Sequence, residues 1–142
     1  MSNIEKKSIN IPHLINLPKI VDPRGNLSFL EEETHLPFKI ARTFWIHDVP
    51  GGEKRGGHAY KTQQEFIIAL SGSFDVVINT GKYEQRFHLN RSYYGLYVPA
   101  MIWREMDNFS TNSLALVVVD KPFNEEDYIR DFSNYNQLVN GQ

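Results

Sequence analysis

The sequence contains no cysteine, so disulfides, thiolate metal sites and a cysteine nucleophile are all excluded. It also lacks an apolar run long enough to span a bilayer. The first residues, Met1–Ser8, lack the apolar core of a secretory signal. These absences predict a cytoplasmic protein without a membrane partner.

Excess charge of one sign is lacking as well. The formal net charge is -2, and no block of like charges occurs along the chain. A nucleic-acid partner is therefore not expected, because such proteins present a basic face. A phosphorylated small molecule remains compatible with this charge, since two or three well-placed arginines can bind it. The length of 142 residues, with 41% hydrophobic side chains, predicts one globular domain over residues 1–142.

Short apolar runs separated by turn residues predict an all-β sandwich or barrel. Ser71-Gly72-Ser73 is expected to form a tight hairpin, and residues 79–82 a second one. The run Leu114–Val119 is apolar on both faces, which indicates a central strand. The expected strands are 27–33, 41–48, 65–70, 74–79, 83–89, 95–98, 102–106 and 114–119.

Only the end of the chain has the pattern of a helix. Asn124 is a good N-cap, and Glu125–Asp127 would place negative charge in the first turn. Tyr128, Ile129 and Phe132 would then share one face. We expect this short helix to pack on the sandwich or on a partner subunit.

A histidine and a carboxylate occur at a recognisable spacing in the middle of the chain. Five residues separate Gly52 from His58, and Tyr60 follows two positions later. Four residues lie between Tyr60 and Glu65, and six between Glu65 and Gly72. This spacing resembles the first motif of the cupin superfamily, in which a second histidine stands where this chain has Tyr60.

A second motif follows a few dozen residues later. Pro99 and Asn108 stand where the second cupin motif has proline and asparagine, whereas Met101 replaces its glycine and Arg104 its histidine. Two motifs in the right order on a β-rich chain are more specific than either alone. The resemblance implies a cupin-type β-sandwich, or jelly roll, with a short C-terminal helix.

The four metal-ligand positions of a metallocupin are His58, Tyr60, Glu65 and Arg104 in this chain. Arginine is a permanent cation with no lone pair to donate, and a neutral tyrosine is a poor ligand. One histidine and one carboxylate are too few for a tight site. We therefore expect no metal and no cofactor, which argues against a metallocupin.

Longer segments resemble the dTDP-sugar 3,4-ketoisomerase family, and they span a core of about residues 20–135. The resemblance implies a homodimer and no metal. It also implies conversion of dTDP-4-keto-6-deoxyglucose into a 3-keto sugar, for deoxyamino sugars of a bacterial cell surface such as those of lipopolysaccharide. The segments are 22–27, 36–42, 55–59, 70–73, 95–99, 103–106 and 127–130.

Catalytic roles follow from the chemistry together with this resemblance. The C4 carbonyl acidifies the hydrogen on C3, and a base removes it to give an enediolate. Histidine is the natural base near neutral pH, and the base of the family corresponds to His58. Tyr60, with Arg104 nearby, would shuttle the hydroxyl proton or hold the enediolate, because arginine stabilises a developing oxyanion.

Five further residues are candidate substrate contacts. Arg24 is expected to contact the sugar, and Arg42 and Arg55 the pyrophosphate, because a guanidinium fork matches phosphate oxygens. Glu65 belongs to the first motif. Tyr97 precedes the second motif and is expected to face the pocket.

Two departures from the family pattern keep other functions open. The chain has His58-Ala59-Tyr60 where typical members have His-x-His, and Phe44-Trp45 where many have two tyrosines. Each change removes a group that can move a proton. The alternatives are a dTDP-4-keto-sugar 3,5-epimerase, which would need acid and base groups at two carbons, and a nucleotide-sugar-binding cupin with weakened or lost activity.

Overall fold

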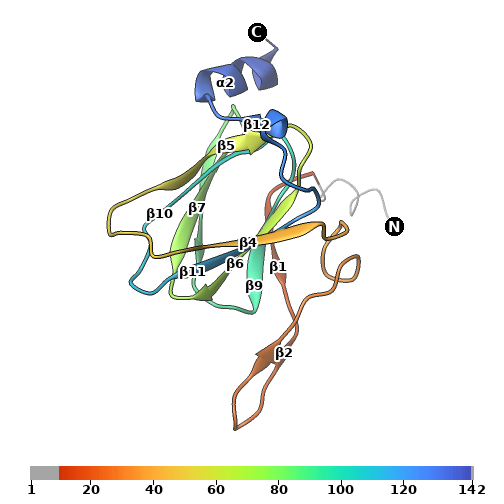
Figure 1. The fold of residues 1–142 in the computed structure, drawn as a ribbon, viewed down its shortest axis with the longest axis vertical. Helices are drawn as coiled ribbons and strands as arrows, with labels where there is room; N and C mark the ends of the chain where they lie inside the picture. The colour runs from red at the N-terminus through yellow and green to blue at the C-terminus, as the bar shows by residue number, and fades with distance from the viewer. Residues whose placement is uncertain (1–9, 142) are drawn as a thin grey trace.

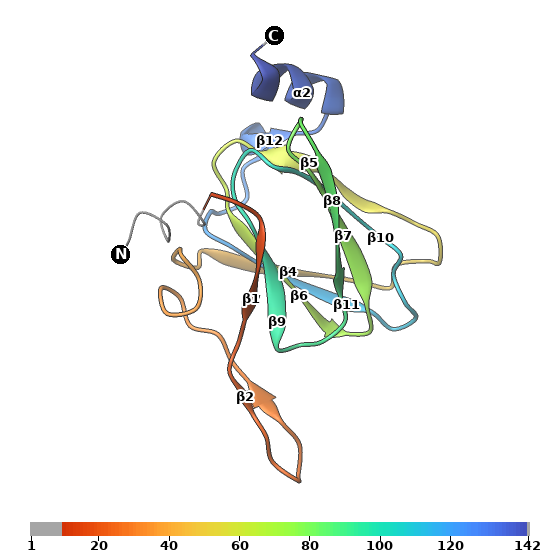
Figure 2. The same cartoon turned by 180° about the vertical axis from the view of Figure 1, so that it is seen from behind.

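The computed structural model describes residues 10–141, so the segment Met1–Ser8 lies outside the described residues. Two five-stranded antiparallel sheets face each other (Figures 1 and 2). The first sheet has the order β1 (His13–Asn16), β9 (Tyr94–Val98), β6 (Glu65–Ser71), β11 (Leu114–Val119) and β4 (Arg42–His47). The second has the order β12 (Tyr128–Ile129), β5 (Arg55–Tyr60), β10 (Trp103–Asp107), β7 (Phe74–Asn79) and β8 (Glu84–Leu89).

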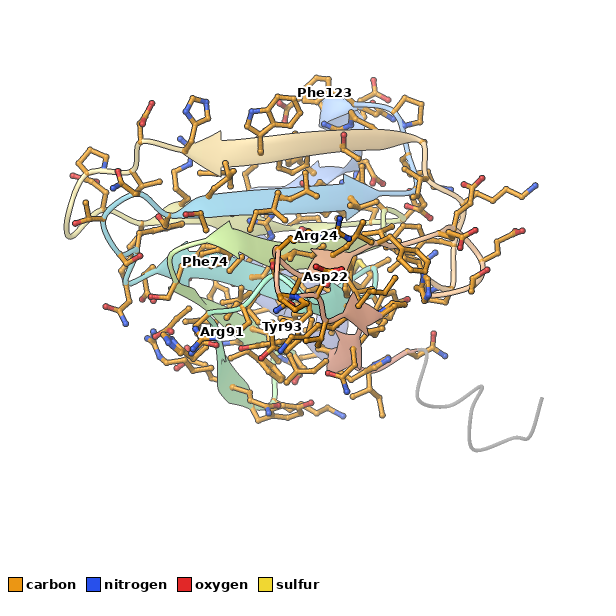
Figure 3. All side chains as sticks on the ribbon, turned by 90° about the horizontal axis from the view of Figure 1, so that it is seen from below. Asp22, Arg24, Phe74, Arg91, Tyr93 and Phe123 are labelled. Atoms are coloured by element: carbon orange, nitrogen blue, oxygen red, sulfur yellow. The ribbon has the colours of Figure 1, made fainter. Side chains whose placement is uncertain are left out.

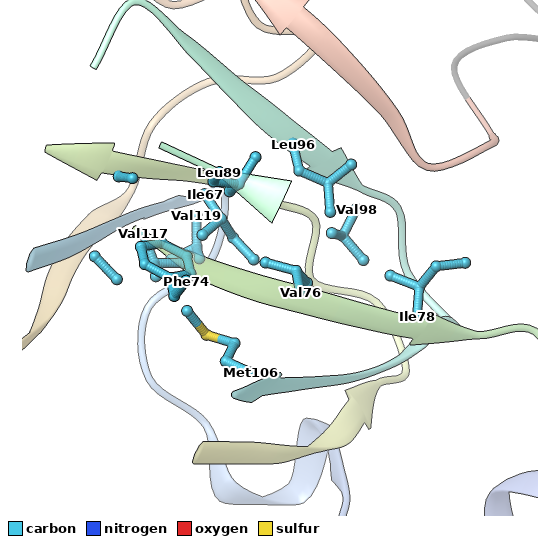
Figure 4. Close-up of a cluster of buried hydrophobic side chains, with 12 residues drawn as sticks. Ile67, Phe74, Val76, Ile78, Leu89, Leu96, Val98, Met106, Val117 and Val119 are labelled. Atoms are coloured by element: carbon cyan, nitrogen blue, oxygen red, sulfur yellow. The ribbon is translucent and has the colours of Figure 1, made fainter. Parts of the chain in front are cut away.

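The main core fills the space between the two sheets (Figure 4). It forms because alternate residues of each strand point inward, which is the period of two expected for packed sheets. Its buried members are Ile67, Ala69, Phe74, Val76, Ile78, Leu89, Leu96, Val98, Met106, Ala115, Val117 and Val119. The all-β sandwich predicted from the sequence is confirmed.

Two smaller clusters cover the outer faces of the sheets. On the first sheet, Phe66, Ile68 and Val118 are covered by side chains from the N-terminal segment that include Leu36 and Phe38. On the second, α2 (Phe132–Asn140) closes the end near β12, as Figure 1 shows. Within residues 10–141, no helix has the length and apolar character that crossing a membrane requires.

Several expected element boundaries differ in the structure. The turn 71–73 is not a hairpin, because β6 belongs to the first sheet and β7 to the second. It carries the chain from one sheet to the other, with Gly72 at a φ of 65°. The second predicted hairpin is confirmed, since β7 pairs with β8 through the turn at Gly81. The run 114–119 is an interior strand, as predicted.

The helix predicted from Asn124 starts later. Asn124 does accept a hydrogen bond from the Glu126 backbone, but it caps only a single 3-10 turn, η1 (Glu125–Asp127). Tyr128 then pairs with β5, and the α-helix begins after a second cap, Asp131. The prediction was wrong because pairing with the free edge of β5 outweighs local helix preference for these residues.

Within the chain between β1 and β4, residues 19–28 form an arm that projects away from both sheets (Figures 1 and 2). The predicted strand 27–33 is reduced to a short pair, β2 (Lys19–Ile20) with β3 (Leu27–Ser28). Ile20, Val21 and Leu27 are exposed on this arm.

Candidate active site

A cavity of about 370 Å³ opens where β4, the edge strand of the first sheet, faces β5 and β12 of the second. β4 contributes apolar side chains from its inner face, and the rest of the lining is polar, aromatic or basic. The lining residues are Phe44, Ile46, Lys54, Arg55, Gly56, His58, Tyr60, Arg104, Tyr128 and Arg130. Three of them, His58, Tyr60 and Arg104, were predicted as catalytic from the motifs.

Strand β5 positions the first two of these residues. Alternate residues point inward, so His58 and Tyr60 face the cavity while Ala59 packs under α2. Tyr128 lies directly opposite Tyr60 across the β12–β5 pair. The rings of His58, Tyr60 and Tyr128 contact one another edge to face, with centroids 4.7–5.1 Å apart.

The imidazole of His58 is neutral and incompletely hydrogen-bonded. Its Nε2 is buried and has no hydrogen-bond partner among the described residues. Burial, together with the charges of Arg104 and Arg130, lowers the pKa of His58 to about 2. A buried polar nitrogen without a partner is unusual in a folded protein, and a ligand that supplies the partner would relieve its cost.

The lowered pKa of His58 should be visible in the pH dependence of stability. The unfolded chain binds a proton at this histidine below about pH 6.5, whereas the folded chain does so only near pH 2. The contribution of His58 to the free energy of unfolding is therefore complete above pH 6.5. It is lost as the pH falls below that value, by up to about 1.4 kcal/mol per pH unit. Urea unfolding of the wild type and His58→Gln between pH 7 and pH 4 should give the steeper slope for the wild type. Equal slopes would contradict the neutral buried state.

Arg104, which lines the cavity, forms a buried ion pair with Glu65. Each side chain is at most 2% exposed, and Arg104 Nη2 donates to Glu65 Oε1 at 2.8 Å. Arg104 Nε also donates to both carboxylate oxygens at 3.1 Å. Burial alone would lower the pKa of Arg104, but the Glu65 carboxylate raises it above its ordinary value. Glu65 does not line the cavity, and its carboxylate is engaged by Arg104, so the prediction that it contacts the substrate is wrong.

A β-bulge in β5 makes room for this arginine. Arg104 pairs with His58 but Met106 pairs with Arg55, so two glycines of β5 lie opposite Glu105. Gly56 has a φ of 76°, and a Cβ there would overlap Arg104 Nη1. The Gly56-Gly57 pair was a sequence signal for this bulge, and sequence reasoning did not use it.

These two glycines give a matched test of how closely β5 approaches Arg104. Gly56→Ala should destabilise the fold by about 1–3 kcal/mol, because a non-glycine residue is strained at positive φ and its methyl group displaces the buried guanidinium. Gly57→Ala should be tolerated, since its Cβ would meet only Trp103 and Glu105, at 3.6 and 3.8 Å. Thermal unfolding of both variants checks this. Equal stability of the two would contradict the assignment.

The predicted substrate contacts lie in different places. Arg55 lines the cavity. Arg42 lies beside the cavity, where its guanidinium packs over the Phe44 ring and donates to Gln63 Oε1 at 3.2 Å. Arg24 lies outside the cavity lining, on the projecting arm. Its side chain is 91% exposed and paired with Asp22 (Figure 3).

The prediction that Tyr97 faces the pocket is wrong. Leu96 and Val98 point into the main core, so the intervening Tyr97 points to the outer face of the first sheet. There it is buried and donates a hydrogen bond to Gln64.

Among the polar and charged side chains of the cavity lining, three were missed by the sequence reasoning. Tyr128 and Arg130 flank Ile129 in a segment interpreted as helix, and Lys54 precedes the bulge. The Arg130 guanidinium lies 4.0 Å from the Tyr128 ring centroid and is bound by both carboxylate oxygens of Glu125. The segment 127–130 is one of the stretches that resemble the ketoisomerase family, and this resemblance was the available signal.

The donor set does not suit a divalent cation. Arg104 stands at one ligand position and occupies the carboxylate of Glu65, which stands at another. Among residues 10–141, no group of three or more histidine and carboxylate side chains has the geometry to hold a metal ion. The absence of a resident metal stays a prediction, and it rests on the chemistry of these four side chains.

The fold and the cavity define a cupin-type protein with a site built from histidine, tyrosine and arginine. The family model described as "WxcM-like, C-terminal" (FdtA) matches residues 10–140. The chain therefore belongs to this family, as its sequence predicted.

Characterised relatives are isomerases of nucleotide sugars. A TDP-4-oxo-6-deoxy-alpha-D-glucose-3,4-oxoisomerase of Aneurinibacillus thermoaerophilus is 36% identical over 126 residues, which cover 89% of this chain and 91% of the relative. A 3,4-ketoisomerase from Helicobacter canadensis superimposes with a TM-score of 0.88 at 36% identity, over 91% of this chain and 97% of the other.

A third relative has been solved with its sugar nucleotide bound. A histidine-to-asparagine variant of the 3,4-ketoisomerase QdtA from Thermoanaerobacterium thermosaccharolyticum, in complex with TDP-4-keto-6-deoxyglucose, gives a TM-score of 0.90 at 30% identity. The match covers 92% of this chain and 95% of that one. The family and these relatives support an isomerase that interconverts 4-keto and 3-keto sugars.

Proposed function

We propose that this chain is a 3,4-ketoisomerase that converts TDP-linked 4-keto-6-deoxyglucose into the 3-keto-6-deoxyhexose. The observation that carries the proposal is the buried, neutral His58 with an unpaired Nε2 in the cavity. A neutral imidazole is ready to accept a proton from carbon, and the substrate would supply the contact that Nε2 lacks.

The reaction needs one base and two proton movements. His58 removes the proton from C3, and the resulting negative charge spreads over C3, C4 and the C4 oxygen. The positive charge of Arg104, held by Glu65, stabilises this enediolate. Tyr60 takes part in moving the hydroxyl proton between the two oxygens. Protonated His58 then delivers its proton to C4, which leaves the ketone at C3.

The enediolate also raises the proton affinity of His58. The two arginines that depress the pKa of the free imidazole would be compensated by the bound anion. The histidine thus becomes more basic when the negative charge forms beside it. This change links proton uptake to the formation of the intermediate.

Basic side chains in and beside the cavity fit the diphosphate. Lys54 and Arg55 line the cavity, and Arg42, at the start of β4, lies beside it over the ring of Phe44. We assign the diphosphate to Arg55 and Arg42, because guanidinium forks match phosphate oxygens.

We also propose a homodimer, as the family resemblance implied. The arm exposes Ile20, Val21 and Leu27, which a second copy of the chain would cover. A sugar contact by Arg24 then requires that the arm reach the partner's cavity, because Arg24 lies outside the cavity of its own protomer. Light scattering on a sizing column should give twice the chain mass of 16.5 kDa. A cytoplasmic location and a product used for cell-surface glycans are part of the same proposal.

The test is incubation of the protein with dTDP-4-keto-6-deoxyglucose in deuterated water, followed by NMR. A 3-keto product with deuterium at C4 would support the isomerase, and the C4 coupling would give its stereochemistry. Retention of the 4-keto sugar with deuterium at C3 and C5 would favour the 3,5-epimerase instead. Binding of dTDP without any exchange would mark a binding protein. His58 is the one histidine in the cavity lining, which favours chemistry at one carbon.

A further inference from the structure

Tyr128 is the cavity residue whose placement the motifs did not predict. Strand β12 pairs with β5 so that Tyr128 lies opposite Tyr60, and their hydroxyl oxygens are 3.4 Å apart. The Tyr128 ring is also 5.1 Å from that of His58, centroid to centroid. Two phenol groups therefore meet beside the base that takes the carbon-bound proton.

We propose that Tyr128 is a further catalytic residue, which completes with Tyr60 a relay carrying the hydroxyl proton from O3 to O4 of the enediolate. This inference rests on the proposed 3,4-ketoisomerase function. From the sequence, the transfer of the hydroxyl proton was assigned to Tyr60 with Arg104. The structure adds Tyr128, on β12, to this step.

The chemistry of the side chains favours two hydroxyls at this step. An imidazole accepts a proton at one ring nitrogen and donates another from the second nitrogen, so it bridges two separated oxygens by itself. A phenol accepts and donates at a single oxygen. Where the family pattern has a second histidine, this chain has Tyr60, and Tyr128 restores a second point of transfer 3.4 Å away.

The relay balances without any external acid or base. After His58 has taken the C3 proton, O3 still carries hydrogen and O4 is negative. The O3–H bond breaks as Tyr60 accepts that proton, and Tyr60 passes its own proton to Tyr128. Tyr128 in turn passes its proton to O4. Both phenols end neutral, the negative charge has moved to O3, and His58 protonates C4.

The surroundings keep both phenols in place and Tyr60 protonated. Burial and the Glu65 charge raise the pKa of Tyr60, so a phenolate does not accumulate there. Arg130 lies over the Tyr128 ring at 4.0 Å, and Glu125 holds Arg130 through two hydrogen bonds. Arginine cannot serve in the relay itself, since it has no lone pair with which to accept a proton.

The experiment separates the carbon step from the oxygen step. Tyr128→Phe, Tyr60→Phe and the double variant are compared with the wild type in deuterated water, following loss of the C3 hydrogen and appearance of the 3-keto sugar. Both phenylalanine variants should keep C3 exchange within a few-fold. Formation of the 3-keto sugar should fall by about 100-fold or more, the usual contribution of a positioned proton donor. The double variant should be no slower than the singles, because one relay is already broken.

The controls make each outcome decisive. Tyr83→Phe, at a half-exposed tyrosine beside the β7–β8 turn, should change neither rate. Deuterium at C4 of the wild-type product shows that the proton on His58 exchanges with solvent, so C3 exchange is a valid readout. Wild-type rates of isomerisation in Tyr128→Phe, or an equal loss of C3 exchange and isomerisation, would overturn the relay. A wild type that binds dTDP but exchanges no C3 hydrogen would overturn the proposed function itself.

Discussion

His58→Asn should lower the rate of C3 proton abstraction by roughly 100- to 10,000-fold, the contribution of a general base. The substitution removes the only imidazole in the cavity lining, and neither Tyr60 nor Tyr128 replaces it, because a neutral phenol is a far weaker base. The measurement is loss of the C3 hydrogen signal of dTDP-4-keto-6-deoxyglucose in deuterated water. Thermal stabilisation by dTDP should persist in the variant, which would show that the binding site is intact.

The matched control is His47→Asn. His47 is the same residue type on β4, and its side chain is 58% exposed outside the cavity. This variant should react at the wild-type rate. Retention of C3 exchange in His58→Asn would show that another group is the base. A loss of dTDP binding would instead give His58 a role in holding the ligand.

Glu65→Gln should cost about 3–5 kcal/mol of stability, because it leaves the guanidinium of Arg104 buried without its counter-charge. At this chain length the loss corresponds to a melting temperature lower by roughly 10 °C or more. Glu125→Gln removes one partner of an ion pair whose two side chains are 61% and 54% exposed. It should cost at most about 1 kcal/mol. The two variants make the same chemical change in buried and exposed settings.

A double replacement distinguishes a buried-charge effect from simple loss of packing. Glu65→Leu combined with Arg104→Met removes both charges while keeping an apolar filling, and it should regain most of the lost stability. Activity should not return with stability, because no cation remains near the developing oxyanion. Chemical denaturation provides the stabilities, and the exchange assay the rates. A double variant as unstable as Glu65→Gln would show that packing, not charge, dominates this site.

Much of the site was predictable because strand periodicity is a local property. The motif identified His58 and Tyr60, two residues apart, as site residues. The structure places both on β5, a strand missing from the predicted set, and both face the cavity. The same rule would have placed Tyr97 correctly. Its neighbours Leu96 and Val98 are core residues, so Tyr97 had to point the other way.

Other features depend on which strands become neighbours. The bulge at Gly56 and the buried pair of Arg104 with Glu65 join residues from β5, β10 and β6, which belong to two different sheets. The turn 71–73 had the composition of a hairpin, yet it crosses between those sheets. Local composition predicts a turn, but the packing of the two sheets decides which strands it connects.

The sequence by itself determined the β-sandwich, the choice of His58 and Tyr60 as site residues, and the unsuitability of the motif residues as metal ligands. These follow from side-chain period and side-chain chemistry, which each segment carries alone. Only the tertiary structure decided that Tyr128 lies opposite Tyr60, that Glu65 forms an ion pair with Arg104, and that Arg24 lies on an arm outside the cavity. These three features depend on contacts between segments that are far apart in the sequence. Such contacts form when a strand pairs with the edge of a sheet or when apolar faces pack together.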